Sequence, residues 1–291
     1  MYPKTIGFFD SGQGGLFVLK KFLEEFKDLN FIYLGDNARY PYGNKGLETI
    51  QQYAKEGVEF LISQGASEII IACGTVSSGA MEYLSQKFSN PCVGIVDVMC
   101  YRGKEILNKY TGTVGILGTR FTTESQSFRK KLISLGVNQI WEKACSLWVP
   151  LVEEGLRGTH FVQEACHIYL EDCPDDVSCI FLGCTHFPYL IPDIAKYLFE
   201  KTQRMIVLDD PNDTYEKDIQ NKNILINGSY PPIFLIESGS LIKNTMRKYI
   251  NSDYQKSHQK IFCTEDAHKF QKIAKIWLSN GANLPIYQAK I

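Results

Sequence analysis

The segment IIIACGTVSSGA, residues 69–80, places four hydrophobic residues directly before a cysteine, Cys73. A short apolar run that stops at small residues is typical of a buried strand followed by a loop. The segment CIFLGCTHFP, residues 179–188, repeats this arrangement before Cys184. In both segments a threonine follows the cysteine within two residues. The sequence therefore predicts two thiols at the ends of two buried strands, and a function for the chain has to explain both.

The composition favours a globular protein that binds a small molecule. The chain has 291 residues, 44% of them hydrophobic, which is enough for one large domain or two smaller ones. Its 31 Lys and Arg balance 32 Asp and Glu, and no basic run is suited to nucleic acid. The start, MYPKTIGFFDSG, fits neither a signal peptide nor a membrane span. We therefore expect a cytoplasmic protein with no nucleic-acid or membrane partner.

The cysteine pattern gives little support to a metal or redox motif. There are nine cysteines and no CxxC pair, so zinc ribbons and thioredoxin-like sites are not favoured. A group of His and Cys residues between positions 160 and 173 matches no metal-site spacing. We expect no metal, and we interpret the cysteines other than the strand-end pair and Cys166 as small buried hydrophobic residues in a reducing compartment.

Short apolar runs alternate with longer segments of helical period, which predicts an α/β fold with a mainly parallel sheet. The predicted strands are residues 5–9, 30–36, 68–74, 92–97, 113–119, 179–185 and 233–239. The clearest predicted helices are residues 16–26 and 48–65. Ligands of such sheets bind at the carboxyl ends of the strands. The polar or reactive residues at those ends are Asp10, Asp36, Cys73, Thr119, Cys184 and Glu237.

A weak internal repeat suggests two related halves. FFDSG, residues 8–12, is matched by LIESG, residues 235–239, and ACGT is matched by GCT at the two thiols. Chance similarity between short strand ends is the alternative. Residues 203–232, rich in Asp, Asn and Pro, interrupt the alternation and predict a surface insertion to which we assign no chemistry.

The segment FDSGQGG does not match a dinucleotide fingerprint, because the third glycine would fall at Phe17. Asp10, at the end of the preceding strand, would also place a negative charge near any phosphate. Two interpretations of Asp10 stay open. It caps the following helix, or it orders a polar ligand or a neighbouring thiol.

A single cysteine is usually structural, but the repeated context favours a reactive pair. Each thiol is predicted close to a helix start, where the helix dipole stabilises a thiolate. This matters because a thiol with a pKa of about 8.5 is only roughly 3% ionised at pH 7. His186 can exchange a proton with Cys184, although a purely structural histidine is the alternative. Two such thiols suit either a disulfide pair or a two-base proton transfer that inverts a stereocentre.

An ordered series of motifs resembles the glutamate racemase family, within the aspartate/glutamate racemase superfamily. The series runs from residue 7 to about residue 240, and residues 262–278 resemble the C-terminal helix region of that family. The motifs are FDSGQGGLFVL, YLGDNARYPYG, ACGTVSSGA, PLVEEG, FLGCTHFPYL and LIESG. Six motifs in the expected order are far more specific than any one of them.

The resemblance implies a two-domain α/β fold with pseudo-twofold symmetry, each domain having a mainly parallel central sheet flanked by helices. We expect the first domain to comprise residues 1–97 and 208–291, including the 203–232 insertion, and the second to comprise residues 98–207. The active site is expected between them. The implied activity is interconversion of L- and D-glutamate without a cofactor, supplying D-glutamate for peptidoglycan and so for cell-wall biogenesis and cell shape. The resemblance also allows a homodimer.

The resemblance assigns roles to particular residues. It implies that Cys73 takes the proton from D-glutamate, with help from Asp10. It implies that Cys184 takes the proton from L-glutamate, with help from Glu153 and His186. The implied substrate-binding residues are Asp10, Ser11, Pro41, Tyr42, Gly43, Gly74, Thr75, Thr119, Thr122, Thr185 and His186. Hydroxyl and backbone donors suit the carboxylates of the substrate, because they add no charge near the thiols.

One departure from the family pattern lies beside the first thiol. The usual Cys-Asn-Thr is Cys73-Gly74-Thr75 here, which removes a side-chain amide. Losing such a donor costs about 1 to 3 kcal/mol if its partner is left unpaired. The usual Asp of the LIESG motif is also replaced, by Glu237. Gly74 keeps two alternatives open: a racemase of aspartate or another acidic amino acid, and a ligand-binding relative that has lost catalysis.

Overall fold

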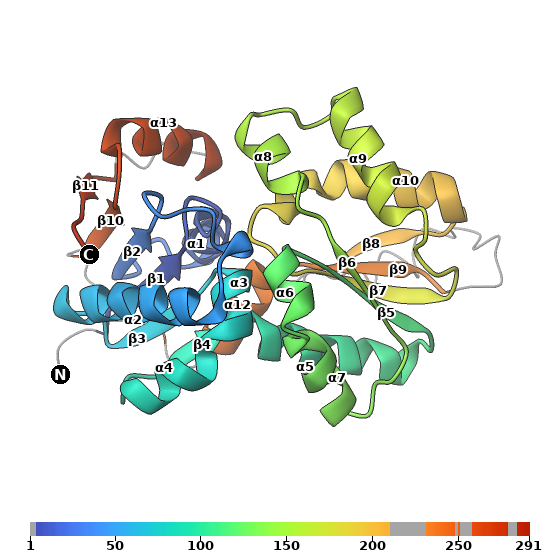
Figure 1. Ribbon diagram of the computed structural model, residues 1–291, viewed down its shortest axis with the longest axis horizontal. Coiled ribbons are helices and arrows are strands. Elements are labelled where there is room, and N and C mark those ends of the chain that lie inside the picture. Colours follow the sequence, from blue (N-terminus) through green and yellow to red (C-terminus); the bar gives the residue numbers. More distant parts are fainter. Residues whose placement is uncertain (1–3, 210–230, 248–249, 251–257, 279–283) are drawn as a thin grey trace. The chain divides into compact units, whose positions relative to one another are not determined.

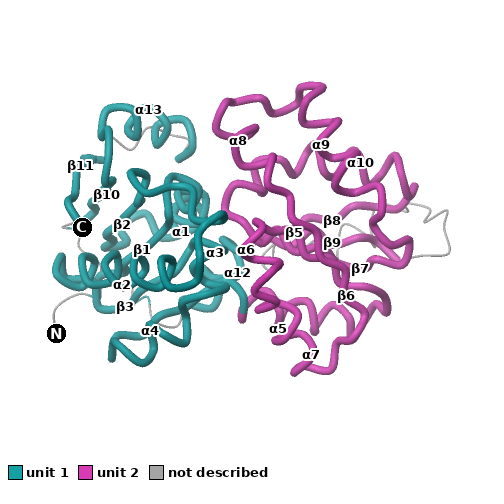
Figure 2. Tube along the Cα trace, viewed as in Figure 1, with its two compact units in different colours: residues 1–96, 238–291 teal, residues 97–237 magenta. Residues whose placement is uncertain are grey.

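The computed structural model describes residues 4–209, 231–247, 250, 258–278 and 284–291 (Figure 1). The chain divides into two compact units, each with its own sheet (Figure 2). The first unit comprises Met1–Val96 and Ser238–Ile291, and the second comprises Asp97–Glu237. The prediction of parallel sheets flanked by helices is confirmed in both units.

The first unit is built on a six-stranded parallel sheet with the order β11-β10-β2-β1-β3-β4. Its strands are β1 (Ile6–Asp10), β2 (Phe31–Gly35), β3 (Glu68–Ile71), β4 (Cys92–Gly94), β10 (Gln259–Cys263) and β11 (Ile286–Gln288). Its helices are α1 (Leu16–Glu25), η1 (Tyr42–Asn44), α2 (Leu47–Ser63), α3 (Gly74–Gly79), α4 (Met81–Lys87), α12 (Ser238–Met246) and α13 (Ala267–Trp277).

The second unit has a five-stranded parallel sheet with the order β6-β5-β7-β9-β8. Its strands are β5 (Thr113–Gly118), β6 (Ile140–Ala144), β7 (Val177–Leu182), β8 (Ile206–Asp209) and β9 (Ile233–Ile236). Its helices are α5 (Ile95–Lys109), which begins in the first unit, α6 (Arg120–Glu124), α7 (Ser127–Ser134), α8 (Trp148–Glu153), α9 (His160–Leu170), η2 (Phe187–Leu190) and α10 (Ile191–Thr202). Figure 1 shows α5 and α7 on one side of this sheet and α9 and α10 on the other.

The central strands are buried along their whole length. Every residue of β1, β3, β5 and β7 is buried, as expected for parallel strands covered on both faces. Aromatic rings fill the first core, where Phe8 meets the edges of Phe22 and Phe31 with ring centroids 5.1 and 6.3 Å apart. Gly57 lets α2 approach the sheet closely, because a Cβ there would lie 2.3 Å from the ring of Phe9. These packed strands hold their carboxyl ends in fixed positions.

The structure corrects the expected return of the chain to the first domain. We expected residues 208–291 to belong to the first domain, but the second unit continues to Glu237. The reason is strand pairing: β9 lies beside β7, with Phe234 opposite Cys179, and β8 lies beside β9. Within the expected 203–232 insertion, Ile206–Asp209 is therefore a strand of the second sheet. Residues 210–230 of that insertion lie outside the described residues.

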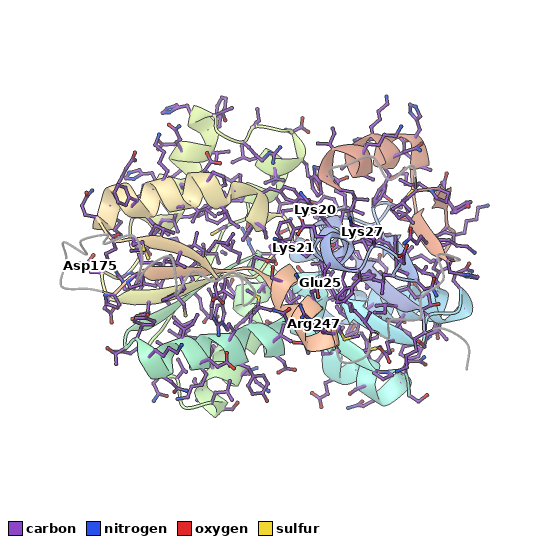
Figure 3. All side chains as sticks on the ribbon, turned by 180° about the vertical axis from the view of Figure 1, so that it is seen from behind. Lys20, Lys21, Glu25, Lys27, Asp175 and Arg247 are labelled. Carbon is purple, nitrogen blue, oxygen red and sulfur yellow. The ribbon has the colours of Figure 1, made fainter. Side chains whose placement is uncertain are left out.

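The helix that follows β9 belongs to the first unit because it packs against α1. Glu25, the last residue of α1, forms ion pairs with Lys243 on α12, at 3.2 Å, and with Arg247 directly after it, at 2.6 Å. Glu25 and Arg247 are labelled in Figure 3. The Lys243 side chain is only 7% exposed, whereas that of Glu25 is 30% exposed. The division between the units thus falls between Glu237 and Ser238.

The two units share a strand arrangement, but only one of the two sequence repeats follows it. In each sheet the first strand lies between the second and the third, as β2-β1-β3 and β6-β5-β7. Cys73 follows β3 and Cys184 follows β7, so the two thiols occupy equivalent strand ends. LIESG follows a different pattern, because it ends β9, whereas the strand equivalent to β1 is β5. The match between FFDSG and LIESG does not reflect equivalent positions.

Candidate active site

In the first unit, Cys73 lies where β3 ends and α3 begins. It is the N-cap of α3, and its carbonyl accepts a hydrogen bond from the Ser77 amide at 2.9 Å. The thiol is only 5% exposed and donates to Ser11 Oγ at 3.3 Å. Ser11 follows β1, which lies next to β3 in the sheet. The structure therefore brings two of the predicted residues into contact at the carboxyl edge of the first sheet.

Asp10, the last residue of β1, is fully buried beside this contact. Its Oδ1 accepts a hydrogen bond from the Gly12 amide at 3.0 Å. Gly15, and not Asp10, is the N-cap of α1, and no side chain caps that helix. Asp10 is therefore not the N-cap residue of α1, and its Oδ1 binds the loop before that helix. A Cβ on Gly15 would lie 2.6 Å from the Cβ of Asp10, which explains why a small residue is required there.

Tyr42, from the YPYG motif, is held by a buried carboxylate and not by the thiol. Its hydroxyl donates to Asp36 Oδ2, and Arg39 Nε donates to the same oxygen at 2.6 Å. Burial raises the pKa of Tyr42 well above its usual value, and the charges of Asp36 and Cys73 act in the same direction. The phenol is therefore a neutral donor within electrostatic range of the Cys73 sulfur.

The other residues predicted in the first unit differ in exposure. Gly74 and Thr75 are buried at the start of α3, directly after the thiol. Pro41 is exposed and Gly43 is half-buried, on either side of Tyr42. The loop around η1 therefore buries Tyr42 while the residues on either side of it stay at least partly exposed.

In the second unit, Cys184 belongs to a chain of three side chains. Its Sγ lies 3.9 Å from His186 Nδ1, and the other ring nitrogen, Nε2, lies 2.9 Å from Glu153 Oε1. Cys184 and His186 follow β7, whereas Glu153 is the last residue of α8. His186 is 2% exposed and Cys184 is 7% exposed. The structure therefore brings together all three residues expected on this side.

The surroundings of His186 favour its charged form. Burial alone would lower its pKa, but the hydrogen bonds to Cys184 and Glu153 outweigh burial and raise the pKa of His186 to about 10. An imidazolium donates from both ring nitrogens, which matches its two acceptors. These contacts place the imidazole beside the Cys184 thiol, as proton exchange between the two side chains requires.

Two threonines line the neighbouring strand end. Thr119, directly after β5, caps α6 by accepting a hydrogen bond from the Thr122 amide at 3.3 Å. The two hydroxyls lie 3.0 Å apart, and Thr122 is fully buried. Thr185, between the thiol and the imidazole in sequence, is 3% exposed. All of these residues lie at the carboxyl edge of the second sheet, as predicted.

A comparison with protein families identifies the chain. The model described as Asp/Glu/Hydantoin racemase matches residues 14–209, which is most of the chain and includes both thiols. The chain belongs to this racemase family. The resemblance seen in the six motifs is thereby confirmed.

Individual racemases match almost the whole chain. The glutamate racemase of Persephonella marina is 32% identical over 96% of this chain and 95% of its own length. That of Campylobacter jejuni is 31% identical over 94% and 98%, and its crystal structure matches with a TM-score of 0.77. The crystal structure of Thermus thermophilus glutamate racemase in complex with beta-chloro-D-alanine matches with a TM-score of 0.78 and 29% identity, over 99% of this chain and 97% of that one. The full α/β architecture of this racemase-family chain is thus shared with solved relatives.

Other features of this racemase-family chain concern metals and membranes. Among the described residues, no group of three or more His, Cys, Asp and Glu side chains is arranged to hold a metal ion. All nine cysteines are free thiols. No helix within the described ranges has the length and apolar character needed to span a membrane.

Sequence reasoning missed two residues that support the site of this racemase-family chain. Trp148 is fully buried on α8 and meets the edge of Phe187, which directly follows His186, with ring centroids 5.0 Å apart. Thr264 follows β10 and donates to Asp36 Oδ1 at 2.9 Å. The only sequence signals were an aromatic residue before PLVEEG and a threonine in the C-terminal motif. Neither indicates its long-range partner.

Proposed function

We propose that this chain interconverts L- and D-glutamate with Cys73 and Cys184 as two acid–base groups. One of them removes the α-proton, and the other gives a proton to the opposite face of the α-carbon. One observation carries the proposal. In each unit a buried cysteine follows the third strand, and the two sheets place that strand in the same position. Each cysteine has its own side-chain partner, which is Ser11 for Cys73 and His186 for Cys184. Relatives named glutamate racemase match nearly the full length of the chain, which supports glutamate as the substrate.

The two thiols have different neighbours, which suits complementary roles. His186 offers a positive charge 3.9 Å from Cys184 Sγ, and Glu153 holds the ring from the other side. In this scheme Cys184, beside the imidazole, is the base that removes the α-proton of L-glutamate. Cys73 donates to Ser11 and so begins as a thiol. It gives its proton to the opposite face of the α-carbon, which yields D-glutamate.

Protons and charges balance in this scheme. The α-carbon–hydrogen bond breaks, its proton passes to Cys184, and the carbanion takes the proton of the Cys73 thiol. The reverse reaction exchanges the two roles, with Asp10 beside Cys73 and His186 beside Cys184 assisting each transfer. The mechanism requires the two thiols to reach opposite faces of one α-carbon.

The substrate is held mainly by neutral donors in this proposal. The first unit provides Asp10, Ser11, Pro41, Tyr42, Gly43, Gly74 and Thr75, and the second provides Thr119, Thr122, Thr185 and His186. Hydroxyl groups and backbone amides bind carboxylates, and the carboxylate of Asp10 suits the ammonium group. Gly74 provides no side-chain donor, so binding at that position depends on the backbone or on water. No cofactor takes part.

The biological setting belongs to the same proposal. The D-glutamate would enter peptidoglycan synthesis in the cytoplasm and thereby support the cell wall and cell shape. Association into a homodimer is part of the expectation, and its test is the mass of the protein in solution.

Proton NMR in deuterium oxide tests the reaction directly. Wild-type protein, free of added cofactor, should replace the α-proton of both L- and D-glutamate by deuterium, while chiral analysis shows the opposite enantiomer accumulating. Cys73→Ser and Cys184→Ser should each lower the rate of inversion at least about 1,000-fold, because a serine hydroxyl is a far weaker acid and base. Cys92→Ser, at a half-buried cysteine of β4, serves as the matched control and should keep full activity.

The outcomes separate the alternatives that Gly74 leaves open. Absence of exchange and inversion with both glutamate enantiomers would rule out glutamate racemisation. Inversion of aspartate in the same assay would then reassign the substrate. Tight binding of an enantiomer without any exchange would favour a ligand-binding protein.

A further inference from the structure

Asp36 is a fully buried carboxylate at the end of β2, and three side chains donate to it. Tyr42 and Arg39 bind its Oδ2, and Thr264 binds its Oδ1. The amide of Asp36 also donates to the carbonyl of Asp10 at 3.0 Å. A buried carboxylate is stable only when its oxygens are well bonded, so these contacts fix its position. Asp36 therefore connects the strand end beside the first thiol with the loop that carries Tyr42.

The hydroxyl of Thr264 is both a hydrogen-bond donor and a hydrogen-bond acceptor. The hydroxyl donates to Asp36 Oδ1 at 2.9 Å and accepts from the Ala38 amide at 2.8 Å. Replacing the hydroxyl by a methyl group would therefore leave one acceptor and one donor without their partner. This threonine is separated from Asp36 by 228 positions in the sequence.

Asn37 strengthens the same connection. Its side-chain oxygen accepts from the amides of Thr264 and Glu265, at 3.0 and 3.1 Å, and its Nδ2 donates to the Glu265 carbonyl at 2.6 Å. The two segments meet because β10 pairs with β2, with Cys263 opposite Gly35. We call the contacts of Asp36, Asn37 and Ala38 with Thr264 and Glu265 the β2–β10 clasp.

The β2–β10 clasp acts on the tyrosine loop through Asp36. Tyr42 is 1% exposed, its ring packs against Tyr53 with centroids 5.4 Å apart, and its hydroxyl ends on Asp36. The carbonyl of Tyr42 accepts from the Lys45 amide at 3.0 Å, which closes the turn of η1. A shift of the carboxylate would therefore move the phenol, and with it the backbone of Pro41 and Gly43.

We propose that Thr264 is a positioning residue, which acts through Asp36 and Tyr42 to hold the loop of residues 41–43 in its substrate-binding position. The role of that loop in binding rests on the proposed function. Thr264 thus extends the site to the C-terminal segment of the chain, and its effect is on substrate affinity and not on proton transfer.

Two variants and a matched control test this role. Thr264→Val removes the hydroxyl but keeps the shape, whereas Thr264→Ser keeps the hydroxyl. Thr245→Val is the control, because within the described part of the chain the Thr245 hydroxyl bonds only the Leu241 carbonyl of its own helix. Each protein is examined by steady-state kinetics with L- and D-glutamate, by thermal unfolding, and by hydrogen exchange of peptides that cover residues 36–45.

We expect Thr264→Val to raise KM about tenfold for both enantiomers, with kcat within about threefold of wild type, because uniform binding is lost. Exchange of the residue 36–45 amides should accelerate at least about threefold, since the loop loses its anchor. Thr264→Ser should return KM to within about twofold, and Thr245→Val should change neither KM nor exchange in that peptide. Because the enantiomers have equal free energy, kcat/KM must fall equally in both directions.

Each result decides one question. Unchanged exchange at residues 36–45 in Thr264→Val would overturn the positioning role, whatever the activity. A fall in kcat with unchanged KM would overturn the assignment to substrate affinity. If wild-type protein does not turn over glutamate, the proposed function fails, and the exchange rates alone then judge whether Thr264 positions the loop.

Discussion

His186 Nε2 lies 2.9 Å from Glu153 Oε1, which joins the end of α8 to the loop after β7. The same ring presents Nδ1 to Cys184, so the acid and the thiol bind opposite edges of one imidazole. The first thiol donates to the Ser11 hydroxyl at 3.3 Å. The two cysteines proposed to transfer protons therefore have different side-chain partners, although both follow the same strand of the shared arrangement.

The raised pKa of His186 makes the stability of the fold depend on pH. Its pKa rises from the ordinary 6.5 to about 10 in the folded protein. The folded state then holds a proton that the unfolded state has lost, so the stabilisation is fully present below about pH 6.5 and declines as the pH rises toward 10. We expect the stability advantage of wild type over His186→Gln to shrink by at least about 2 kcal/mol between pH 6 and pH 10.

Urea unfolding of both proteins at several pH values measures this difference. Using the difference between wild type and variant cancels the titration of groups that do not interact with His186. A difference that stays constant across this window would show that folding does not raise the pKa of His186.

Glu153 should act through the imidazole. Glu153→Gln keeps a hydrogen-bonding group of the same length but removes the negative charge, so the pKa of His186 should fall. We expect kcat/KM to decrease at least about tenfold, with the loss growing as the pH is raised from 7 to 9. A pH profile of kcat/KM for the two proteins provides the measurement. Parallel profiles would contradict an electrostatic role for this carboxylate.

Gly15 should be intolerant of even one methyl group. A Cβ there would lie 2.6 Å from Asp10 Cβ and 3.0 Å from the Tyr33 hydroxyl oxygen. We expect Gly15→Ala to cost about 1 to 3 kcal/mol of stability and to lower activity by displacing Asp10. Gly46→Ala is the control, because nothing lies within 4 Å of its Cβ and its φ of −72° suits alanine. Equal behaviour of the two variants in unfolding and racemase assays would refute the steric argument.

Trp148 should be replaceable by phenylalanine but not by alanine. The indole meets the edges of Phe187 and Tyr169, and its buried Nε1 has no hydrogen-bond partner among the described residues. Trp148→Phe therefore loses no hydrogen bond and should cost less than about 1.5 kcal/mol, whereas Trp148→Ala should cost about 3 to 5 kcal/mol. Denaturant unfolding of both variants checks the difference. If Trp148→Phe costs as much stability as Trp148→Ala, the indole Nε1 of the wild-type protein makes a hydrogen bond.

The sequence predicted the central strands better than the peripheral ones. Central parallel strands such as β3 and β7 are apolar runs, and they were recognised from that pattern alone. The strand β6 was missed because it lies at a sheet edge and contains Glu142 and Lys143, which pair with Arg129 and Asp172. Charged side chains on a half-buried edge strand hide the alternation on which such predictions depend.

Recognition of the central strands also allowed part of the site to be predicted. The rule that ligands bind at the carboxyl ends of strands located both thiols, Asp10 and Thr119. The domain to which β9 belongs could not be predicted, because strand order is set by pairing between distant segments. The bond between Asp36 and Thr264 was likewise beyond sequence patterns, since it joins residues 228 positions apart.

The placement of β10 between β2 and β11 has a consequence for synthesis of the protein on the ribosome. All of the second unit, Asp97–Glu237, is translated before Ser238, so it can complete its sheet early. The first unit begins earlier but finishes last, because β2 keeps an open edge until residues 259–263 emerge. A nascent chain that stops before this point would present an unpaired strand to its neighbours. Completion of the half that carries Cys73 thus depends on a strand that is made after the whole second unit.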